Sequence, residues 1–563
     1  MKIRYCLFAM MMACQNPSFA DIDIKNANFH QTWSDINVGS LGFDLTVSRT
    51  YNSRSLYKGI FGLGWSSNLE MRLQKLPEGQ IKVINCDCGL QKEFYPQNFS
   101  FKRKTQLLAQ IHLKLKAEQK TPQEINDIIS KIENDDEARL AWAKKYNLLE
   151  LNTEQTTFEN NSEKVTYLQS ATGGVYTWQR FDGTRYTFNE QGLLVTMEDR
   201  SGNYLRYSYI NEKLDKIESA TGQYLQLSYN AKNQLTKINS STGENLFYAF
   251  DQSNSLNKVK KNGSDYYRYQ YDDLFNLTKI THRKNLVTSI SYDTNNDWVT
   301  KIKYDDGCTQ NFVYDFDQAM PDMHYWLTTK VTCEKRVISN DKYEFLYQYV
   351  DDIQDIKLFE QTKHTQDGMR KVIYDLRTEK PKFVETEQTS IKYDYNDKGQ
   401  LLTKEMIDKT DNRQFYHITF GYAQNDLINT VTLKELDFDT NVSTQKVAYL
   451  NYNANNQLIF IQDYQGDKFD ITYNDKGLIE TMLASDGKKL HLEYEPRFGK
   501  PHKVSLEGVG EITVTYQSNG QIDKIDGSSM EVSFKVANTM NKLLDKLTIT
   551  NQDFYQEANL ENN

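Results

Sequence analysis

Apolar and polar residues alternate along many short stretches of this chain, and each stretch ends in an aromatic ring. Residues 205–209 read Leu-Arg-Tyr-Ser-Tyr, residues 225–229 read Leu-Gln-Leu-Ser-Tyr, and residues 469–473 read Phe-Asp-Ile-Thr-Tyr. A period of two places the apolar side chains on one face of a β-sheet and the polar side chains on the other. The pattern therefore predicts many short strands whose rings share one face.

The rings recur at a nearly constant interval. They lie at positions 188, 209, 229, 250, 271 and 292 and again at 452, 473, 494 and 516. A fixed period of this size indicates one supersecondary unit, repeated because no single copy buries its apolar face alone. The rings predicted to form the core of the repeats are Tyr209, Tyr229, Phe250, Tyr271, Tyr292, Tyr452, Tyr473, Tyr494 and Tyr516.

Each unit carries two turn signals, which predicts two strands per unit. One turn follows the ring, as in residues 230–233, and the other lies about halfway between rings and holds a glycine, as in Thr221-Gly222. Glycine supplies the positive φ that tight hairpins need. The strand after the ring carries apolar residues three apart, such as Leu235 and Ile238. Strict alternation does not place both on one face, so we expect either a β-bulge or a turn that tucks the leucine inward.

The motif Tyr-[Asn/Asp]-x-x-[Gly/Asn]-x-Leu-x-x-Ile resembles the YD repeat of the RHS and teneurin-like shell proteins over about residues 165–535. Residues 39–53, Gly-Ser-Leu-Gly-Phe-Asp-Leu-Thr-Val-Ser-Arg-Thr-Tyr-Asn-Ser, together with Gly-Leu-Gly-Trp-Ser at 62–66, resemble the segment that opens RHS shells. The resemblance implies a mainly β fold, in which an array of YD-repeat hairpins curls into a spiral sheet, an open barrel or a shell. In relatives the shell encloses a C-terminal toxin or presents a surface for adhesion.

Two features of toxin-bearing relatives are not found in the sequence. Their self-cleaving core contains an Asp-Pro dipeptide, whereas none of the 8 prolines here follows an aspartate. The repeats also continue to about residue 527. We therefore expect neither self-cleavage nor a C-terminal toxin.

Residues 99–157 differ from the repeats in their pattern. Thr121-Pro-Gln-Glu124 forms a capping box with proline at the first helical position, and Ile125, Ile128, Ile129 and Ile132 follow at helical spacing. We expect a small helical insertion. It either covers a sheet edge or shell opening, or binds a partner, and its short apolar faces favour the covering role.

The chain is therefore divided by pattern into seven parts. They are a signal peptide (1–20), an N-terminal β cap resembling the opening of RHS shells (21–98), the helical insertion (99–157), a first YD-repeat array (158–316), an irregular β linker region (317–390), a second array (391–537) and a polar tail (538–563).

Charge and hydropathy exclude two classes of protein. The 67 basic and 76 acidic residues are spread along the chain and give a net charge of −9, whereas a nucleic-acid platform concentrates basic charge. No apolar run after the leader approaches the length that a transmembrane helix needs. We expect no nucleic-acid partner and no transmembrane segment.

The N-terminus predicts export. Lys2 and Arg4 precede a short apolar stretch, and Ser-Phe-Ala ending at Ala20 forms a cleavage signal before Asp21. A lipoprotein reading, with Cys14 lipidated, is the less favoured alternative. Either route takes the chain out of the cytoplasm, to the periplasm, to the cell surface or to the medium.

Four cysteines follow the leader. An exported compartment permits disulfides, and Cys308 and Cys333 lie about one repeat apart, a spacing compatible with neighbouring strands. Cys86 and Cys88 are too close for an easy bond with each other, and Cys-x-x-Cys spacing is absent. A Cys308–Cys333 disulfide, or idle thiols, is favoured over a zinc site.

The sequence contains no His-Glu-x-x-His, Gly-x-Ser-x-Gly or P-loop motif. We expect no enzyme activity, cofactor or metal. The leading hypothesis is an exported non-catalytic scaffold that binds an envelope glycan or a protein at the bacterial cell envelope or surface. The alternative is a shell component that encloses a separate cargo or toxin polypeptide, and a third reading places an enzyme within residues 317–390.

Overall fold

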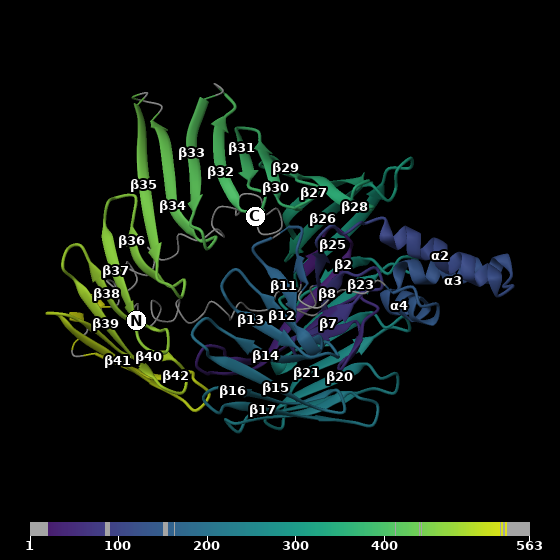
Figure 1. Cartoon of the computed structure of the whole chain (residues 1–563), viewed down its shortest axis with the longest axis horizontal. Helices are drawn as coiled ribbons and strands as arrows, with labels where there is room; N and C mark the ends of the chain where they lie inside the picture. The colour runs from purple at the N-terminus through teal and green to yellow at the C-terminus, as the bar shows by residue number, and fades with distance from the viewer. Residues whose placement is uncertain are drawn as a thin grey trace.

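The computed structural model describes residues 21–84, 91–149, 156–162, 164–410, 413–437, 440, 442–527, 529, 531–532 and 535–536. Strands account for 55% and helices for 10% of the structure, which confirms the mainly β fold expected from the alternation. Most strands belong to one large antiparallel sheet that winds around the molecule, with three helices projecting to one side (Figure 1).

The large sheet runs from β7 to β42, and each strand pairs with the next one in the sequence. Its first part comprises β7 (Arg72–Lys75), β8 (Ile81–Ile84), β9 (Gln91–Pro96), β10 (Thr157–Glu159), β11 (Tyr167–Ser170), β12 (Tyr176–Gln179), β13 (Arg185–Phe188) and β14 (Leu194–Glu198). Next come β15 (Tyr204–Ile210), β16 (Lys213–Ser219), β17 (Tyr224–Tyr229), β18 (Leu235–Ser240), β19 (Asn245–Phe250), β20 (Leu256–Lys261), β21 (Ser264–Tyr271), β22 (Leu277–Thr281), β23 (Val287–Tyr292), β24 (Val299–Lys303) and β25 (Thr309–Phe316).

The second half continues without a break. It comprises β26 (His324–Cys333), β27 (Arg336–Val350), β28 (Asp355–Thr365), β29 (Gly368–Tyr374), β30 (Pro381–Thr386), β31 (Thr389–Tyr395), β32 (Leu401–Asp408), β33 (Arg413–Tyr422), β34 (Ile428–Asp437), β35 (Val442–Tyr452), β36 (Leu458–Gln462), β37 (Lys468–Tyr473), β38 (Ile479–Ala484), β39 (Lys489–Glu495), β40 (Lys500–Leu506), β41 (Gly510–Tyr516) and β42 (Ile522–Gly527).

The sheet is an open spiral. Within the described residues the ladder partner of β42 is β41 and that of β7 is β8, so no ladder joins the two ends. The first eight strands curl tightly enough to bring β7 next to β14, where Leu73 N donates to Gly192 O at 2.8 Å. The remaining strands follow a wider arc (Figure 1).

The arc returns to its own beginning, where turns meet turns. The guanidinium of Arg200, between β14 and β15, donates to Asn456 O at 2.7 Å. Thr221 Oγ1, between β16 and β17, donates to Arg497 O at 3.1 Å, and Gly39 N donates to Asn519 O at 3.1 Å. We call this set of contacts the seam. It is made of hydrogen bonds between loops, not of strand pairing.

Of the two explanations for the three-residue spacing, the structure shows the β-bulge. The strand register shifts between Ser228 and Tyr229, and the same shift precedes other rings of the array. The extra residue lets Leu235 and Ile238 both turn inward, and both are fully buried.

Residues 317–390, which we expected to be an irregular β linker region, are built of regular strands. They form β26 to β30, with the 15-residue β27 as the longest strand of the structure. Alternation is present there, as in Tyr343, Phe345 and Tyr347. The ring-and-turn period that marks the other units is stretched by the longer strands, and the sequence pattern is correspondingly weak.

A separate four-stranded sheet lies against the large one. It contains β1 (Asp21–Asp23), β2 (Asn28–Val38), β3 (Leu45–Asn52) and β6 (Trp65–Ser67), beside the small hairpin of β4 (Lys58–Gly59) and β5 (Gly62–Leu63). Its apolar side chains share one buried cluster with the inward side chains of strands β15 to β27. The N-terminal sheet therefore fills the concave face of the first half of the spiral.

Three helices occupy part of the stretch 99–157. They are α2 (Arg103–Ala117), α3 (Pro122–Asn134) and α4 (Asp136–Lys145). The capping box of Thr121 and Glu124 is present at the start of α3. The helices share a small apolar core of their own and project from the sheet beside β27 and β28 (Figure 1).

Several expectations fall outside the described residues. The signal peptide 1–20 with Ala20, the lipidation candidate Cys14, the pair Cys86 and Cys88, and the polar tail 538–563 are among them. Asp21, the predicted first residue after cleavage, opens β1.

Candidate functional site: the concave wall and the N-terminal sheet

The tyrosine of each repeat joins two neighbouring units. In Tyr229, for example, the hydroxyl donates to Leu214 O, in the strand that leaves the preceding ring, at 2.9 Å. The same bond, at 2.5 to 3.0 Å, joins Tyr209 to Leu194, Tyr271 to Leu256, Tyr292 to Leu277, Tyr314 to Val299, Tyr395 to Pro381, Tyr422 to Leu401, Tyr452 to Ile428, Tyr473 to Leu458, Tyr494 to Ile479 and Tyr516 to Pro501.

These hydroxyls remain donors across the physiological pH range. Burial raises the pKa of Tyr473 and of Tyr494 to about 12, so neither ionises near neutral pH. One such bond contributes about 1 kcal/mol net. Phe250 occupies the equivalent position in β19 without a hydroxyl. The residues of the predicted repeat core thus link neighbouring units and have a structural role.

The residue after the ring shapes the outer turn. Asn230 Oδ1 accepts from Lys232 N at 2.9 Å and from Gln234 N at 3.0 Å. Asn233 then adopts a φ of +62°, a conformation that asparagine tolerates better than most residues. The polar residue of the motif therefore builds the turn, which explains why the ring is followed by Asn or Asp.

A fully buried ion pair lies at the centre of the N-terminal sheet. Arg49 donates to Asp35 through Nε at 2.5 Å and through Nη2 at 3.0 Å, and neither side chain is exposed. The guanidinium carbon lies 5.1 to 5.7 Å from the ring centres of four side chains, Trp33, Trp65, Tyr267 and Tyr269. Two of these rings belong to the large sheet, so the cation joins both sheets.

Further hydrogen bonds connect the two sheets around this pair. Tyr248 OH donates to Asp35 Oδ2 at 2.9 Å, and the indole of Trp65 donates to Tyr271 OH at 2.9 Å. Leu277 N donates to Tyr51 OH at 3.0 Å. Arg49, Tyr51 and Trp65 all come from the opening segment recognised in the sequence, and the structure assigns them to this contact.

Glu70 anchors the loop that carries the small hairpin. It accepts from Tyr57 OH at 3.0 Å and from Ile60 N at 2.8 Å. Ile60 O in turn accepts from Leu235 N of the large sheet at 3.0 Å. Burial raises the pKa of Glu70 from 4.5 to about 7, and the bonds from Ile60 and Tyr57 only partly oppose that rise.

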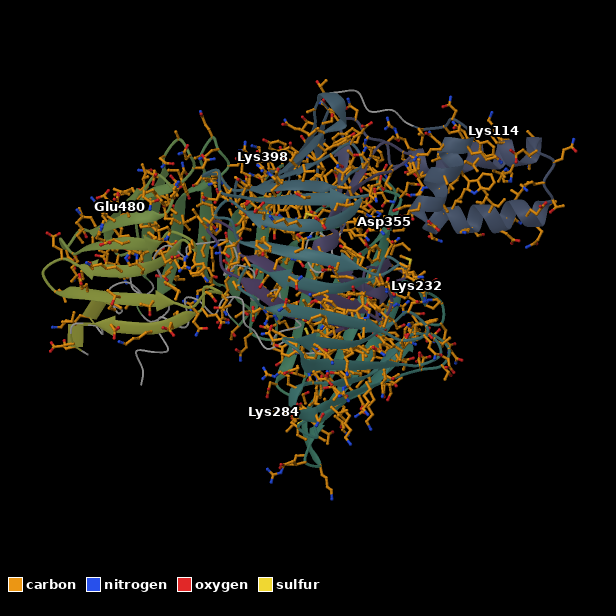
Figure 2. All side chains as sticks on the ribbon, turned by 90° about the horizontal axis from the view of Figure 1, so that it is seen from below. Lys114, Lys232, Lys284, Asp355, Lys398 and Glu480 are labelled. Carbon is orange, nitrogen blue, oxygen red and sulfur yellow. A yellow bond between two sulfur atoms is a disulfide. The ribbon has the colours of Figure 1, made fainter. Side chains whose placement is uncertain are left out.

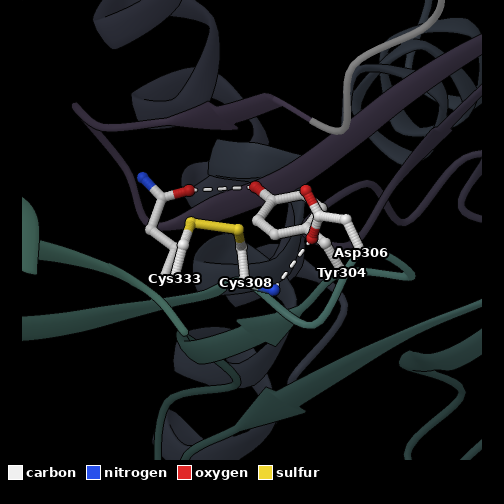
Figure 3. Close-up of a disulfide and its surroundings, with 5 residues drawn as sticks. Tyr304, Asp306, Cys308 and Cys333 are labelled. Atoms are coloured by element: carbon white, nitrogen blue, oxygen red, sulfur yellow. Dashed lines mark hydrogen bonds between the residues drawn. A yellow bond between two sulfur atoms is a disulfide. The ribbon is translucent and has the colours of Figure 1, made fainter. Parts of the chain in front are cut away.

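Cys308 and Cys333 form a disulfide, and their Cα atoms lie 4.2 Å apart (Figure 3). Cys308 precedes β25 and Cys333 ends β26, so the bond ties two adjacent strands. Nearby, Cys308 N donates to Asp306 Oδ1 at 2.8 Å. The setting is that of a structural cross-link between strands.

Residues 317–390 contain a histidine–carboxylate cluster that sequence reasoning missed. His324 Nε2 lies 2.7 Å from Glu344 Oε1, and its Nδ1 lies 3.4 Å from Asp317 Oδ2. Both ring nitrogens are therefore engaged by carboxylates, which suits a tie between strands better than proton transfer to a substrate. His324 and Glu344 lie on the paired strands β26 and β27 but far apart in the sequence, which hid the cluster from motif searching.

The concave face of the second half has its own apolar cluster, formed by strands β29 to β42. Val536 is fully buried in this cluster. Lys404 is also buried there, with its ammonium 5.9 Å from the ring centre of Tyr393 and 5.6 Å from that of Tyr416. No residue of the N-terminal sheet belongs to this cluster, although the loop after β2 meets its edge, where Gly39 N donates to Asn519 O at 3.1 Å.

Among the described residues, no cluster of three or more His, Cys, Asp or Glu is arranged to hold a metal ion. None of the described helices has the length and apolarity needed to cross a bilayer.

Residues 21–90 match a family described as a domain of unknown function (DUF6531). A search of curated proteins finds no match. Among solved structures, the chain is similar to the Tc holotoxin pore of Photorhabdus luminescens, with 8% identity and a TM-score of 0.41 over 88% of this chain and 29% of that one. It is also similar to TcdB2-TccC3 without its hypervariable C-terminal region, with 10% identity and a TM-score of 0.32 over 94% and 32% of the two chains. The chain thus spans about a third of the length of these structures.

Proposed function

We propose that this chain is an exported, non-catalytic YD-repeat scaffold that binds a glycan or a protein at the bacterial cell envelope or surface. The observation that carries the proposal is the filled concave face of the first half. The N-terminal sheet occupies it, with the buried pair of Arg49 and Asp35 at the contact. A wall filled by its own chain offers its outer surface and its loops for binding.

The chemistry of the described residues supports the non-catalytic part. The tyrosine hydroxyls are engaged by backbone carbonyls, and His324 is engaged on both sides by carboxylates. Buried groups such as Arg49 have no exposed surface through which to meet a substrate. Each candidate for chemistry is thus explained by a structural role.

The second candidate function is a shell that encloses a separate polypeptide. It is favoured by the concave side of strands β29 to β42, whose apolar cluster contains no residue of the N-terminal sheet. A partly apolar cargo segment suits such a wall. On this reading the two halves of the spiral differ in role, because only the second half receives cargo.

Native mass spectrometry of the protein purified from its natural host separates the two functions. The scaffold proposal predicts the mass of this chain alone after a salt wash, together with binding of an external ligand by the purified chain. A second polypeptide in stoichiometric amount, protected from added protease, would refute it in favour of the shell. A turnover activity abolished by one point substitution would overturn the non-catalytic assignment.

A further inference from the structure

A cleft lies at the base of the helical insertion. Its volume is about 840 Å³, within the roughly 300–1,000 Å³ typical of ligand sites. The walls come from β8, β9, the starts of α2 and α4, the turn between β27 and β28, and the turn after β29. Figure 2 shows Asp355, which lines this cleft, near the base of the helices that carry Lys114.

A charged network forms the floor of the cleft and fixes its shape. Arg139 Nε donates to Glu78 Oε1 at 2.6 Å, and Lys82 Nζ donates to Asp136 Oδ2 at 2.6 Å. Lys82 also pairs with Glu93 at 3.1 Å. These pairs connect the helices to β8 and β9, so the wall that the insertion contributes is held rigidly.

Two buried acceptors in the lining have no hydrogen-bond partner among the described residues. They are Glu78 Oε2 and Gln80 Oε1. Glu78 is 2% exposed, so bulk water does not readily compensate its second oxygen. A buried acceptor without a donor costs about 1–3 kcal/mol. The cleft therefore suits a ligand that donates hydrogen bonds.

Three aromatic rings form one side of the same cleft. The ring centres of Tyr95, Phe99 and Phe101 lie 4.9 to 5.2 Å from one another, and all three rings are half-buried. Half-buried rings offer apolar faces on which the C–H faces of a sugar can pack. The rings thus provide the apolar part of a site whose remaining lining is mostly polar.

The charges of the lining select among ligand classes. Six basic side chains (Lys82, Lys92, Lys104, Arg139, Lys357 and Arg377) are balanced by six acidic ones (Glu78, Glu93, Glu133, Asp136, Asp355 and Glu379). A phosphate or sulfate group would require excess positive charge, and a cation would require free carboxylates. Five amides, Gln80, Gln91, Asn160, Asn161 and Gln354, add groups that both donate and accept.

From these observations we infer that the cleft at the base of the helical insertion binds a neutral saccharide chain. Sugar hydroxyls donate to the two orphan acceptors and accept from the amides and cations, and one sugar face packs on the rings. The inference deepens the proposed binding function and rests on it. It also gives the helical insertion a binding role, as one wall of the site.

Calorimetric titration of the full mature chain with neutral tetrasaccharides tests the inference. The probes are cellotetraose, maltotetraose and the tetramer of N-acetylglucosamine, with a sulfated tetrasaccharide as the charged comparison. We expect at least one neutral probe to bind and the sulfated one to bind at least tenfold more weakly. We expect Phe101→Ala to weaken binding at least fivefold, whereas Phe247→Ala, a ring 39% exposed on β19 outside the cleft, leaves it unchanged.

The variant Gln80→Met distinguishes a ligand site from an internal structural site. If the orphan amide oxygen serves the ligand, the variant loses at least threefold in affinity while its thermal unfolding midpoint stays the same or rises. A lower midpoint with unchanged affinity would overturn the inference. If the neutral sugars bind but no cleft variant changes their affinity, the inference is also overturned, while the proposed binding function stays intact. Binding of none of the neutral probes, or preference for the sulfated one, refutes the saccharide assignment, and the native mass spectrum then decides the proposed function separately.

Discussion

The tyrosines of the repeat differ in what their hydroxyls do, and this difference predicts a difference in stability. Tyr473 OH makes one hydrogen bond, to Leu458 O at 2.7 Å. Tyr271 OH donates to Leu256 O at 2.7 Å and also accepts from the indole N–H of Trp65 at 2.9 Å. Substitution by phenylalanine removes only the hydroxyl, so the two variants compare one bond with two.

The expected losses follow from burial. Tyr473→Phe removes one hydrogen bond in a half-buried setting, at a cost of about 1 kcal/mol. Tyr271→Phe removes a similar bond and leaves the N–H of Trp65, whose side chain is fully buried, without its acceptor. An unsatisfied buried donor adds about 1–3 kcal/mol, so the total is about 2–4 kcal/mol.

Urea unfolding of the mature chain measures both losses. We expect the midpoint of Tyr271→Phe to fall two to four times as far as that of Tyr473→Phe, with the slope of the unfolding free energy against urea concentration unchanged. In a Trp65→Phe background, which lacks the indole donor, Tyr271→Phe should cost only about 1 kcal/mol. Equal losses for both variants, or the same loss in both backgrounds, would refute the reasoning.

Three further predictions concern the N-terminal sheet and the disulfide. Arg49→Met leaves the Asp35 carboxylate buried without its cation and should destabilise the chain by about 3–5 kcal/mol, whereas adding Asp35→Leu should recover most of that loss in the same urea assay. Burial raises the pKa of Glu70 from 4.5 to about 7, so the folded chain holds a proton that the unfolded chain releases. The resulting stability is complete below pH 4.5 and is lost by up to about 3 kcal/mol as pH rises through 7. Glu70→Gln should remove this dependence of the unfolding free energy on pH, and an unchanged dependence would contradict the assignment. Replacing Cys308 and Cys333 with serine opens a loop with a sequence separation of 25, which should cost about 3 kcal/mol, and a variant as stable as the oxidised parent would contradict it.

Local features of the fold were predictable from the sequence because the same pattern recurs in many copies of the repeat. The alternation around Tyr229 predicted its strand, and the three-residue spacing of Leu235 and Ile238 predicted a bulge or an inward-tucked turn, of which the structure has the bulge. Each depends on residues close together in the chain. In residues 317–390 the sequence predicted β structure but not its regularity, because the greater length of the strands breaks the period while keeping the alternation.

Contacts between distant parts of the chain were not predictable in the same way. The opening segment was recognised, but nothing in the sequence pairs Arg49 with Asp35 or directs its cation toward Tyr269. The same holds for the cleft, where Glu78 and Asp355 meet only after the spiral has formed. Local pattern constrains the hydrogen bonds of a hairpin, whereas the curvature of the whole sheet decides which remote side chains come together.

The seam implies that the large sheet can lengthen or shorten only by whole repeat units. Arg200 meets Asn456 and Thr221 meets Arg497, so each contact pairs a loop near the start of the large sheet with a loop near its end. Gain or loss of one whole two-stranded unit would again place loops opposite loops at the seam. A fractional change would place strand backbones opposite loops and leave these donors without acceptors. Evolution of such a sheet should therefore proceed by whole two-stranded units. The seam, which lacks strand pairing, is the place where the start and the end of the sheet can separate.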